Sequence, residues 1–343
     1  MDIKKLLLGA FAIFCTIYQA QAQAPETKTL EEYASPSVRN MGKSRGIVLG
    51  YERLPQFDIK SESNDPRLES GSGRVRRNNI FDARLYAPLL NRPQTKLIFG
   101  IDYRMEEFNF SRVSPASYDL YRFLEDKNLQ TLGAQLAYLR SIDNRRFYLI
   151  RVKGDLNGDW GKDNTNTDLL DYLKSTIEAG YGWKKSPDYV IGIGFQLGYT
   201  FGRRSIYPAV IYNRTFNDHW GVEAIFPANT RLRYNVNEKT LLYTGYKIDG
   251  ASYNLYVDEG ALADFKEIEL RRTDVKGFLR LEREIYDFLW FSVEGGFRQY
   301  YRNRVFDDIG SRDYALKNDL SGAGYVKVEL YAVPPRRFME KQK

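Results

Sequence analysis

The chain has 343 residues, of which 43% are hydrophobic, 28% are charged and 15% are aromatic, and its formal net charge is +7. Its mean hydropathy of −0.51 excludes a helical membrane protein, because each membrane helix needs about 20 apolar residues. The single cysteine, Cys15, lies in the first apolar stretch, which excludes a disulfide framework and cysteine-ligated metal from the rest of the chain.

The first 22 residues have the pattern of a signal peptide. Lysines at positions 4 and 5 precede an apolar stretch from Leu6 to Ile17, and the sequence Ala20-Gln21-Ala22 fits a cleavage site. We therefore expect an exported chain with four parts. These are a signal peptide at 1–22, a periplasmic segment at 23–44, a barrel at 45–333 and a polar C-terminal tail at 334–343.

Beyond the signal, short segments alternate between apolar and polar residues. Apolar side chains occupy the odd positions from Ile191 to Leu197, and glycine or glutamine occupies the even positions. A period of two with apolar residues outward is typical of a transmembrane β-barrel, whose strands need about 10 residues each. A soluble β-sandwich shows the same alternation. Long strands such as 288–302, and glycines within strands, favour the barrel.

The alternation predicts the strands in chain order. They are Arg45 to Ile59, Asn78 to Leu89, Lys96 to Phe108, Leu129 to Arg140, Arg146 to Leu156, Tyr172 to Lys184, Tyr189 to Phe201, Ile206 to Thr215, Trp220 to Val236, Leu241 to Ile248, Ser252 to Val257, Phe265 to Ile285, Phe288 to Arg302 and Gly324 to Ala332. The stretch from Trp220 to Val236 contains Pro227, so it is either one bent strand or a tight hairpin. The predicted fold is an all-β, antiparallel up-and-down transmembrane barrel of about 14 strands, within roughly 12 to 16.

The connections alternate between long and short in the first half of the chain. Long polar segments are predicted at 61–77, 111–127, 157–171 and 303–320, and brief turns at 91–94, 143–145, 185–188, 217–219 and 286–287. Surface loops of such barrels are long and periplasmic turns are short. Both ends of the predicted barrel are therefore expected on the periplasmic side.

These features resemble a known group of proteins. The signal peptide, the strand beginning Arg45-Gly46-Ile47, the run from Phe226 to Tyr234 and the closing amphipathic strand are similar to those of uncharacterised outer-membrane β-barrel proteins from diderm bacteria. The resemblance implies a barrel, an outer-membrane location, and lipid and the barrel assembly machinery as partners. Many barrels end on an aromatic residue that is used in assembly, whereas here Pro334, Pro335 and a polar tail follow Tyr331. Either assembly reads an internal signal, or the strand ending at Ala332 is not the last one.

Candidate catalytic and metal sites are few. The only histidine, His219, lies in a predicted turn next to Asp218, and neighbours in a tight turn point apart, so no hydrolase constellation is predicted. Asp155, Asn157, Asp159 and Asp163 loosely copy a calcium loop, but Trp160 stands where glycine is needed and Asn166 where the bidentate acid is needed. We expect no metal and no cofactor.

The inward face carries the remaining candidate residues. The candidates for lining the lumen are Asp102, Arg104, Glu106, Lys174, Glu178, Arg280, Glu282, Glu284, Glu294 and Arg298, and the candidate membrane-interface aromatics are Tyr181, Trp183, Tyr199 and Trp220. Because export separates the chain from nucleic acid, basic clusters such as Arg74, Arg76 and Arg77 are expected to meet lipid phosphates or solvent. The inward charges either surround a narrow pore or pair and close the barrel.

The sequence therefore predicts a barrel without catalytic activity, acting as a narrow pore with an unidentified solute or as a structural or surface barrel. An outer-membrane hydrolase and a soluble periplasmic β-protein are the alternatives. A nucleophile beside His219 would favour the hydrolase, and extraction without detergent would favour the soluble protein.

Overall fold

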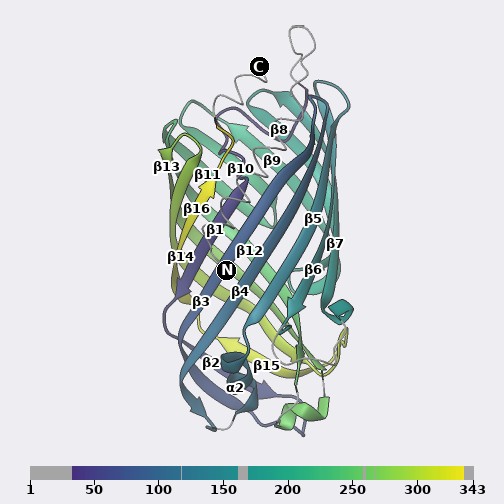
Figure 1. Ribbon diagram of the computed structural model, residues 1–343, viewed down its shortest axis with the longest axis vertical. Coiled ribbons are helices and arrows are strands. Elements are labelled where there is room, and N and C mark those ends of the chain that lie inside the picture. Colours follow the sequence, from purple (N-terminus) through teal and green to yellow (C-terminus); the bar gives the residue numbers. More distant parts are fainter. Residues whose placement is uncertain (1–32, 117, 161–168, 258–259, 266, 336–343) are drawn as a thin grey trace, which may run out of the picture. The chain divides into compact units, whose positions relative to one another are not determined.

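The computed structural model describes residues 33–116, 118–160, 169–257, 260–265 and 267–335, which form one closed antiparallel sheet (Figure 1). The described strands are β1 (Ile47–Leu54), β2 (Phe57–Ser63), β3 (Gly71–Asn91), β4 (Thr95–Ser114), β5 (Leu129–Ser141), β6 (Arg146–Gly158), β7 (Leu173–Ser186), β8 (Tyr189–Thr200), β9 (Arg203–Thr215), β10 (Trp220–Phe226), β11 (Asn229–Asn237), β12 (Thr240–Tyr256), β13 (Glu267–Tyr286), β14 (Leu289–Phe306), β15 (Tyr314–Leu320) and β16 (Ala323–Ala332). The described helical elements are α2 (Asp119–Asp126), η1 (Leu169–Tyr172) and η2 (Ala261–Phe265). Within these ranges, no helix is long and apolar enough to cross a membrane. The predicted signal peptide at 1–22 lies outside the described residues.

The sheet closes because β1 pairs with both β16 and β3. β1 and β2 share one position beside β3, since Leu54 pairs with Asn78 and, beyond Pro55, Phe57 pairs with Val75. β15 and β16 share one position beside β14 in the same way. The described strands therefore make a ring of 14 positions with the fold of an outer-membrane β-barrel, which confirms the predicted fold class.

Three of the predicted strands differ from the structure, but the number of strand positions is unchanged because one is split into two and the other two are joined into one. The stretch from Trp220 to Val236 is a hairpin of β10 and β11, not the single strand assumed for the lower count. The segments 241–248 and 252–257 were predicted as two strands, but they form one strand, β12, which pairs without interruption with β13. Gly250 between them is no turn residue. It allows a close approach, because a Cβ there would lie 2.1 Å from the Cα of Phe201.

The four segments predicted as long loops all contain regular structure, because 61–77 includes the end of β2 and the start of β3, and 157–171 includes the end of β6 and most of η1. The segment 303–320 includes the end of β14 and all of β15, and the segment 111–127 includes α2. In α2 the apolar residues Leu120, Tyr121, Phe123 and Leu124 have helical spacing and are buried, whereas Arg122 between them is exposed. A search for period two alone does not detect such a segment.

The two ends of the ring differ in their connections. The chain enters and leaves the ring at the end with the short turns, where the N–H of Gly46 donates to the carbonyl of Ala332, and Val333 N–H donates to Phe288 in the β13–β14 turn. We call this the short-turn end. The opposite, long-loop end carries α2 and lies at the bottom of Figure 1.

The outer surface of the ring is apolar. On β8 and β13, Ile193 and Leu279 are 57% and 69% exposed, whereas Gly192 and Glu282 on the inward face of the same strands are buried. Large exposed apolar side chains on other strands include Leu49, Phe81, Ile101, Leu136, Ile150, Ile177, Val210, Val293, Val328 and Leu330. Lipid-facing strands of outer-membrane barrels require such a surface.

A charge on this surface should be costly. Replacing Ile193, in the middle of β8, by Arg should lower the free energy of unfolding by roughly 2 to 4 kcal/mol, because the guanidinium would face hydrocarbon. The matched control is Gln196→Arg on the inner face of the same strand. Urea unfolding in lipid vesicles measures both variants, and an equal loss in the two would mean that the faces are inverted.

Candidate functional site: the barrel interior

Buried ion pairs fill the middle of the barrel. The side chain of Lys276 on β13 is 1% exposed, and its Nζ lies 2.5 Å from Glu52 Oε1 on β1 and 3.5 Å from Asp249 Oδ2 on β12. The side chain of Glu52 is 3% exposed. Charges removed from water to this degree are stable only when they are paired and hydrogen-bonded.

Glu329 on β16 is the centre of the largest charged group. Its carboxylate lies 2.7 Å from Arg45, 2.7 Å from Arg84 and 3.0 Å from Lys327, and it also accepts from Arg280. These cations come from the chain before β1 and from three strands. One carboxylate thus joins both sides of the seam where the first and last strands meet.

Other pairs cross the interior between strands that are not neighbours. Glu106 on β4 accepts from Arg272 on β13 at 2.5 Å, and both side chains are at most 4% exposed. Lys174 on β7 lies 3.1 Å from Glu269 on β13. In the strand order, β7 and β13 occupy opposite sides of the ring. These pairs therefore fix the width of the barrel.

All ten predicted lumen candidates take part in ion pairs. Besides the pairs just described, Asp102 binds Lys153, Arg104 lies near Glu106, Glu178 binds Arg151, Arg280 and Arg45 contact Glu282, Lys247 binds Glu294, Asp274 binds Arg298, and Glu284 lies 3.8 Å from Lys239 at the short-turn end. The structure brings Arg280, Glu282 and Glu294 into one group with Glu329, while Asp102 and Glu178 lie in a separate region.

Sequence reasoning missed several partners of these candidates. They are Arg45, Glu52, Asp82, Arg84, Lys247, Glu269, Arg272, Asp274, Lys276, Lys327 and Glu329. The alternation of inward and outward positions could have identified some of them. Arg272, Asp274 and Lys276 occupy the same even positions of β13 as the inward residues Arg280 and Glu282.

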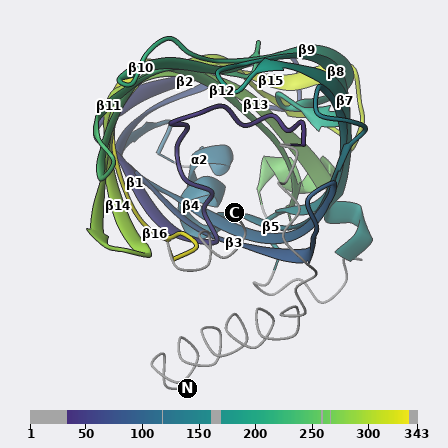
Figure 2. The ribbon, with the colours of Figure 1, turned by 90° about the horizontal axis from the view of Figure 1, so that it is seen from above.

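An apolar plug occupies the long-loop end of the interior. Its helical members are Leu120, Tyr121, Phe123 and Leu124 of α2, and the strand residues packed with them include Ile59, Val75, Leu129, Leu255, Val305 and Leu316. The oxygens of Tyr121 and Ser61 lie 2.7 Å apart, and burial raises the pKa of the Tyr121 phenol, which keeps it neutral. Figure 2 shows α2 inside the ring when the barrel is viewed along its length.

The two sides of the ring also touch directly near the plug. Gly158 at the end of β6 forms a parallel bridge with Asn254 of β12, although these strands lie on opposite sides of the ring. A side chain at Gly158 would overlap the Asn254 carbonyl oxygen, at 2.2 Å. The backbones of two opposite walls therefore meet inside the ring at this level.

The chain before β1 lies against the inner wall at the short-turn end. We call residues 33–46 the N-terminal strap (Figure 2). Ser141 donates to the carbonyl of Ala34 at 2.6 Å, Thr215 donates to that of Arg39 at 2.6 Å, and Asn235 donates to that of Asn40 at 3.1 Å. The strap includes residues predicted as a periplasmic segment, and it narrows this mouth of the barrel.

A chamber of about 440 Å³ remains in the interior, and its lining combines charged side chains with apolar ones such as Phe195 and Ile211. Asp102, Lys153, Asp155 and Arg151 line it, and the Arg151 side chain is 41% exposed. Lys153 Nζ lies 3.2 Å from Asp102 and 2.9 Å from Asp155. The chamber adjoins β7 and β8, where Gly180 pairs with Gly194 and both glycines line it. The missing side chains create space on this wall.

The predicted interface aromatics fall into two groups. The ring centroids of Tyr181 and Trp183 lie 4.9 Å apart. Trp220 is 42% exposed and packs beside Tyr234. These three candidates lie toward the short-turn end. The outward placement of Tyr199 is wrong, because its ring centroid lies 4.5 Å from the Nζ of buried Lys174. Gly198, with φ of +131°, interrupts the regular strand just before it.

The weaker candidates have ordinary surroundings. His219 Nδ1 lies 2.7 Å from the carbonyl oxygen of Asn235, and its ring stacks on Tyr234. Asp155 pairs with Lys153, and Asp159 lies 3.7 Å from Lys127. Asp163 of the loose calcium pattern lies outside the described residues. Among the residues that the structure describes, no group of three or more acidic, histidine or cysteine residues could hold a metal.

A closed antiparallel ring with an apolar exterior and a charged interior defines an outer-membrane β-barrel. The sequence profile of the family described as "Domain of unknown function (DUF6268)" matches residues 107–331, which is more than half of the chain. The chain belongs to this family, which confirms the resemblance to uncharacterised outer-membrane barrel proteins.

A search of solved structures matches this chain to outer-membrane proteins at low sequence identity. An outer membrane channel from Pseudomonas putida F1 is 12% identical, with 90% of this chain and 100% of that chain covered and a TM-score of 0.42. A Pseudomonas aeruginosa FadL homologue is 9% identical, with 84% of this chain and 90% of that chain covered and a TM-score of 0.37. The Pseudomonas putida toluene transporter TodX is 10% identical, with 83% of this chain and 89% of that chain covered and a TM-score of 0.33. A search of curated proteins finds no match.

The pair of Lys276 and Glu52 offers a test of the charged interior. Lys276→Met should lower the free energy of unfolding by roughly 3 to 5 kcal/mol, because it leaves the Glu52 carboxylate buried without its cation. Adding Glu52→Gln should recover part of this loss. Urea unfolding in vesicles measures both variants. A mild effect of the single substitution would indicate that water reaches Glu52.

Proposed function

We propose that this protein is a non-catalytic outer-membrane barrel that is closed along its axis and serves a structural or surface role. The observation that carries the proposal is the apolar plug, because buried side chains of α2 pack with side chains from both sides of the ring. Ions do not cross a packed apolar layer, since unpaired charge is costly there. A permanently open narrow pore is therefore the less favoured of the two functions that the sequence predicts.

The same proposal gives the chain its place in the cell. Residues 1–22 would direct export and be removed, residues 45–333 would be inserted by the barrel assembly machinery, and lipid would contact the apolar outer surface. The short-turn end, with the N-terminal strap and the end of β16, would face the periplasm. The long-loop end would face outward, as in barrels with long surface loops.

The chamber supports a second candidate function, in which the barrel holds a small polar solute and passes it when the plug moves. Its lining carries both signs of charge, including Asp102, Arg151 and Lys153, and its volume of about 440 Å³ fits a small ligand. Paired charges of this kind favour polar or zwitterionic solutes over apolar ones. The hydrolase alternative has less support, because Nδ1 of His219 faces a backbone carbonyl.

Conductance in planar bilayers tests the closed state. The wild-type protein should give no stepwise current, and Leu124→Asp should give current steps, because a charge at this buried position should displace α2 from the plug. The matched control is Arg122→Asp on the exposed side of the same helix, which should stay silent. Steady conductance of the wild type, or equal currents in both variants, would contradict the proposal.

A further inference from the structure

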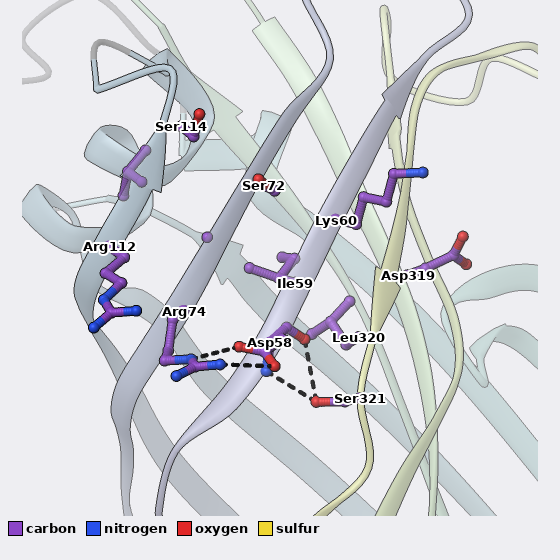
Figure 3. Close-up of a pocket in the computed structure, with 12 residues that line it drawn as sticks. Asp58, Ile59, Lys60, Ser72, Arg74, Arg112, Ser114, Asp319, Leu320 and Ser321 are labelled. Atoms are coloured by element: carbon purple, nitrogen blue, oxygen red, sulfur yellow. Dashed lines mark hydrogen bonds and ion pairs between the residues drawn. The ribbon is translucent and has the colours of Figure 1, made fainter.

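A basic patch lies on the outer surface near the long-loop end. It consists of Lys60 on β2, Arg74, Arg76 and Arg77 on β3, and Arg112 on β4, together with the hydroxyl residues Ser72 and Ser114. A hollow of about 550 Å³ is lined by Lys60, Ser72, Arg74, Arg112 and Ser114 of this patch and by Asp58 and Asp319, while Arg76 and Arg77 continue the patch beyond it (Figure 3).

The strand register explains why these side chains converge. Arg74 pairs with Asp58 on one side and with Arg112 on the other, so these three lie in one row across three strands. In the next row, Ser72 lies between Lys60 and Ser114. Because neighbouring strands are about 4.8 Å apart, the cations span roughly 10 Å around short hydroxyl side chains.

Irregular pairing adds two more cations to the patch. The register between β3 and β4 shifts on both sides of Val75, which interrupts the alternation of faces. The consecutive residues Arg76 and Arg77 are both exposed as a result. A regular strand would turn one of them into the barrel.

The charge of the patch is only partly compensated within the protein. Asp58 accepts from Arg74 at 2.7 Å, and Lys60 pairs with Glu62 at 2.9 Å. Within the described residues, no ion pair joins Arg76, Arg77 or Arg112 to a carboxylate. The patch therefore has three cations available for an external anion.

Apolar surface follows the patch along the same strands. Phe81 and Leu85 on β3 and Ile101 on β4 point outward and are 38%, 37% and 39% exposed. From Arg77 to Phe81 the distance along the strand is roughly 13 Å, at about 3.3 Å per residue. A ligand that carries phosphate next to acyl chains complements both surfaces, whereas a soluble anion would use only the first.

We propose that this patch binds a phosphorylated glycolipid of the outer leaflet, with its phosphates on the arginines and its acyl chains against Phe81, Leu85 and Ile101. The breadth of the patch across three strands suits a headgroup with two phosphates. Guanidinium groups bind phosphate through paired N–H donors. The proposal rests on the outward orientation of the long-loop end in the proposed function.

Native mass spectrometry of the full mature chain in detergent tests this site. The probes are bisphosphorylated lipid A, its monophosphorylated form and inorganic phosphate. The bisphosphorylated form should bind more tightly than the monophosphorylated form, and the variant Arg76→Gln, Arg77→Gln, Arg112→Gln should weaken its binding at least about tenfold. The control variant Arg92→Gln, Arg145→Gln, Lys185→Gln removes the same charge at the short-turn end and should bind normally.

Equal binding by the two triple variants, or no preference for the second phosphate, would overturn the proposal. Displacement of the lipid by inorganic phosphate at equal concentration would instead assign the patch to a free anion, which also overturns it. The conductance experiment does not involve these residues. A silent barrel without lipid binding therefore contradicts only the lipid site, and a conducting wild type contradicts only the closed state.

Discussion

The structure depends on how the space inside the ring is filled. A barrel of about eight strands is just filled by its own inward side chains, and larger barrels enclose a channel unless something occupies it. The 14 strand positions of this ring enclose more space than the inward side chains of regular strands can fill. Ion pairs fill the middle, the helix α2 fills the long-loop end, and the N-terminal strap lines the opposite mouth.

The two kinds of filling follow different physical rules. The apolar plug is stabilised by removal of surface from water and tolerates imperfect geometry. The charged region is stable only as a set, because each buried group depends on a partner from another strand. Pairs such as that of Lys174 and Glu269 join opposite walls, so they hold the ring in one shape. The chamber lies where paired glycines replace such side chains.

The sequence was sufficient for the fold class and for much of the inward face. Period-two alternation identifies which side of each strand is apolar, and the ten charged candidates come from that pattern. It could not show which charges meet. Lys174 and Glu269 are 95 residues apart, and their contact depends on the ring's curvature and strand count. The hairpin at Pro227 and the continuity of β12 through Gly250 also depend on neighbouring strands, because the same residues fit a turn or a strand.

The plug was missed for a different reason. Helix α2 has a period near 3.6 within a segment that is polar on average, so a search for strands treats it as a loop. Its role becomes visible only when the inward side chains of many strands are placed around it.

Thiol accessibility tests the central claim that this end of the interior is packed. The chain has one cysteine, Cys15, within the predicted signal, so an introduced cysteine would be the only thiol after cleavage. Leu129→Cys lies in the plug, where the native side chain is 1% exposed, and Gln196→Cys lines the chamber. A small charged thiol reagent should modify position 196 and leave position 129 unmodified in the folded protein. Equal modification of both positions would show that water reaches the plug and would contradict the account.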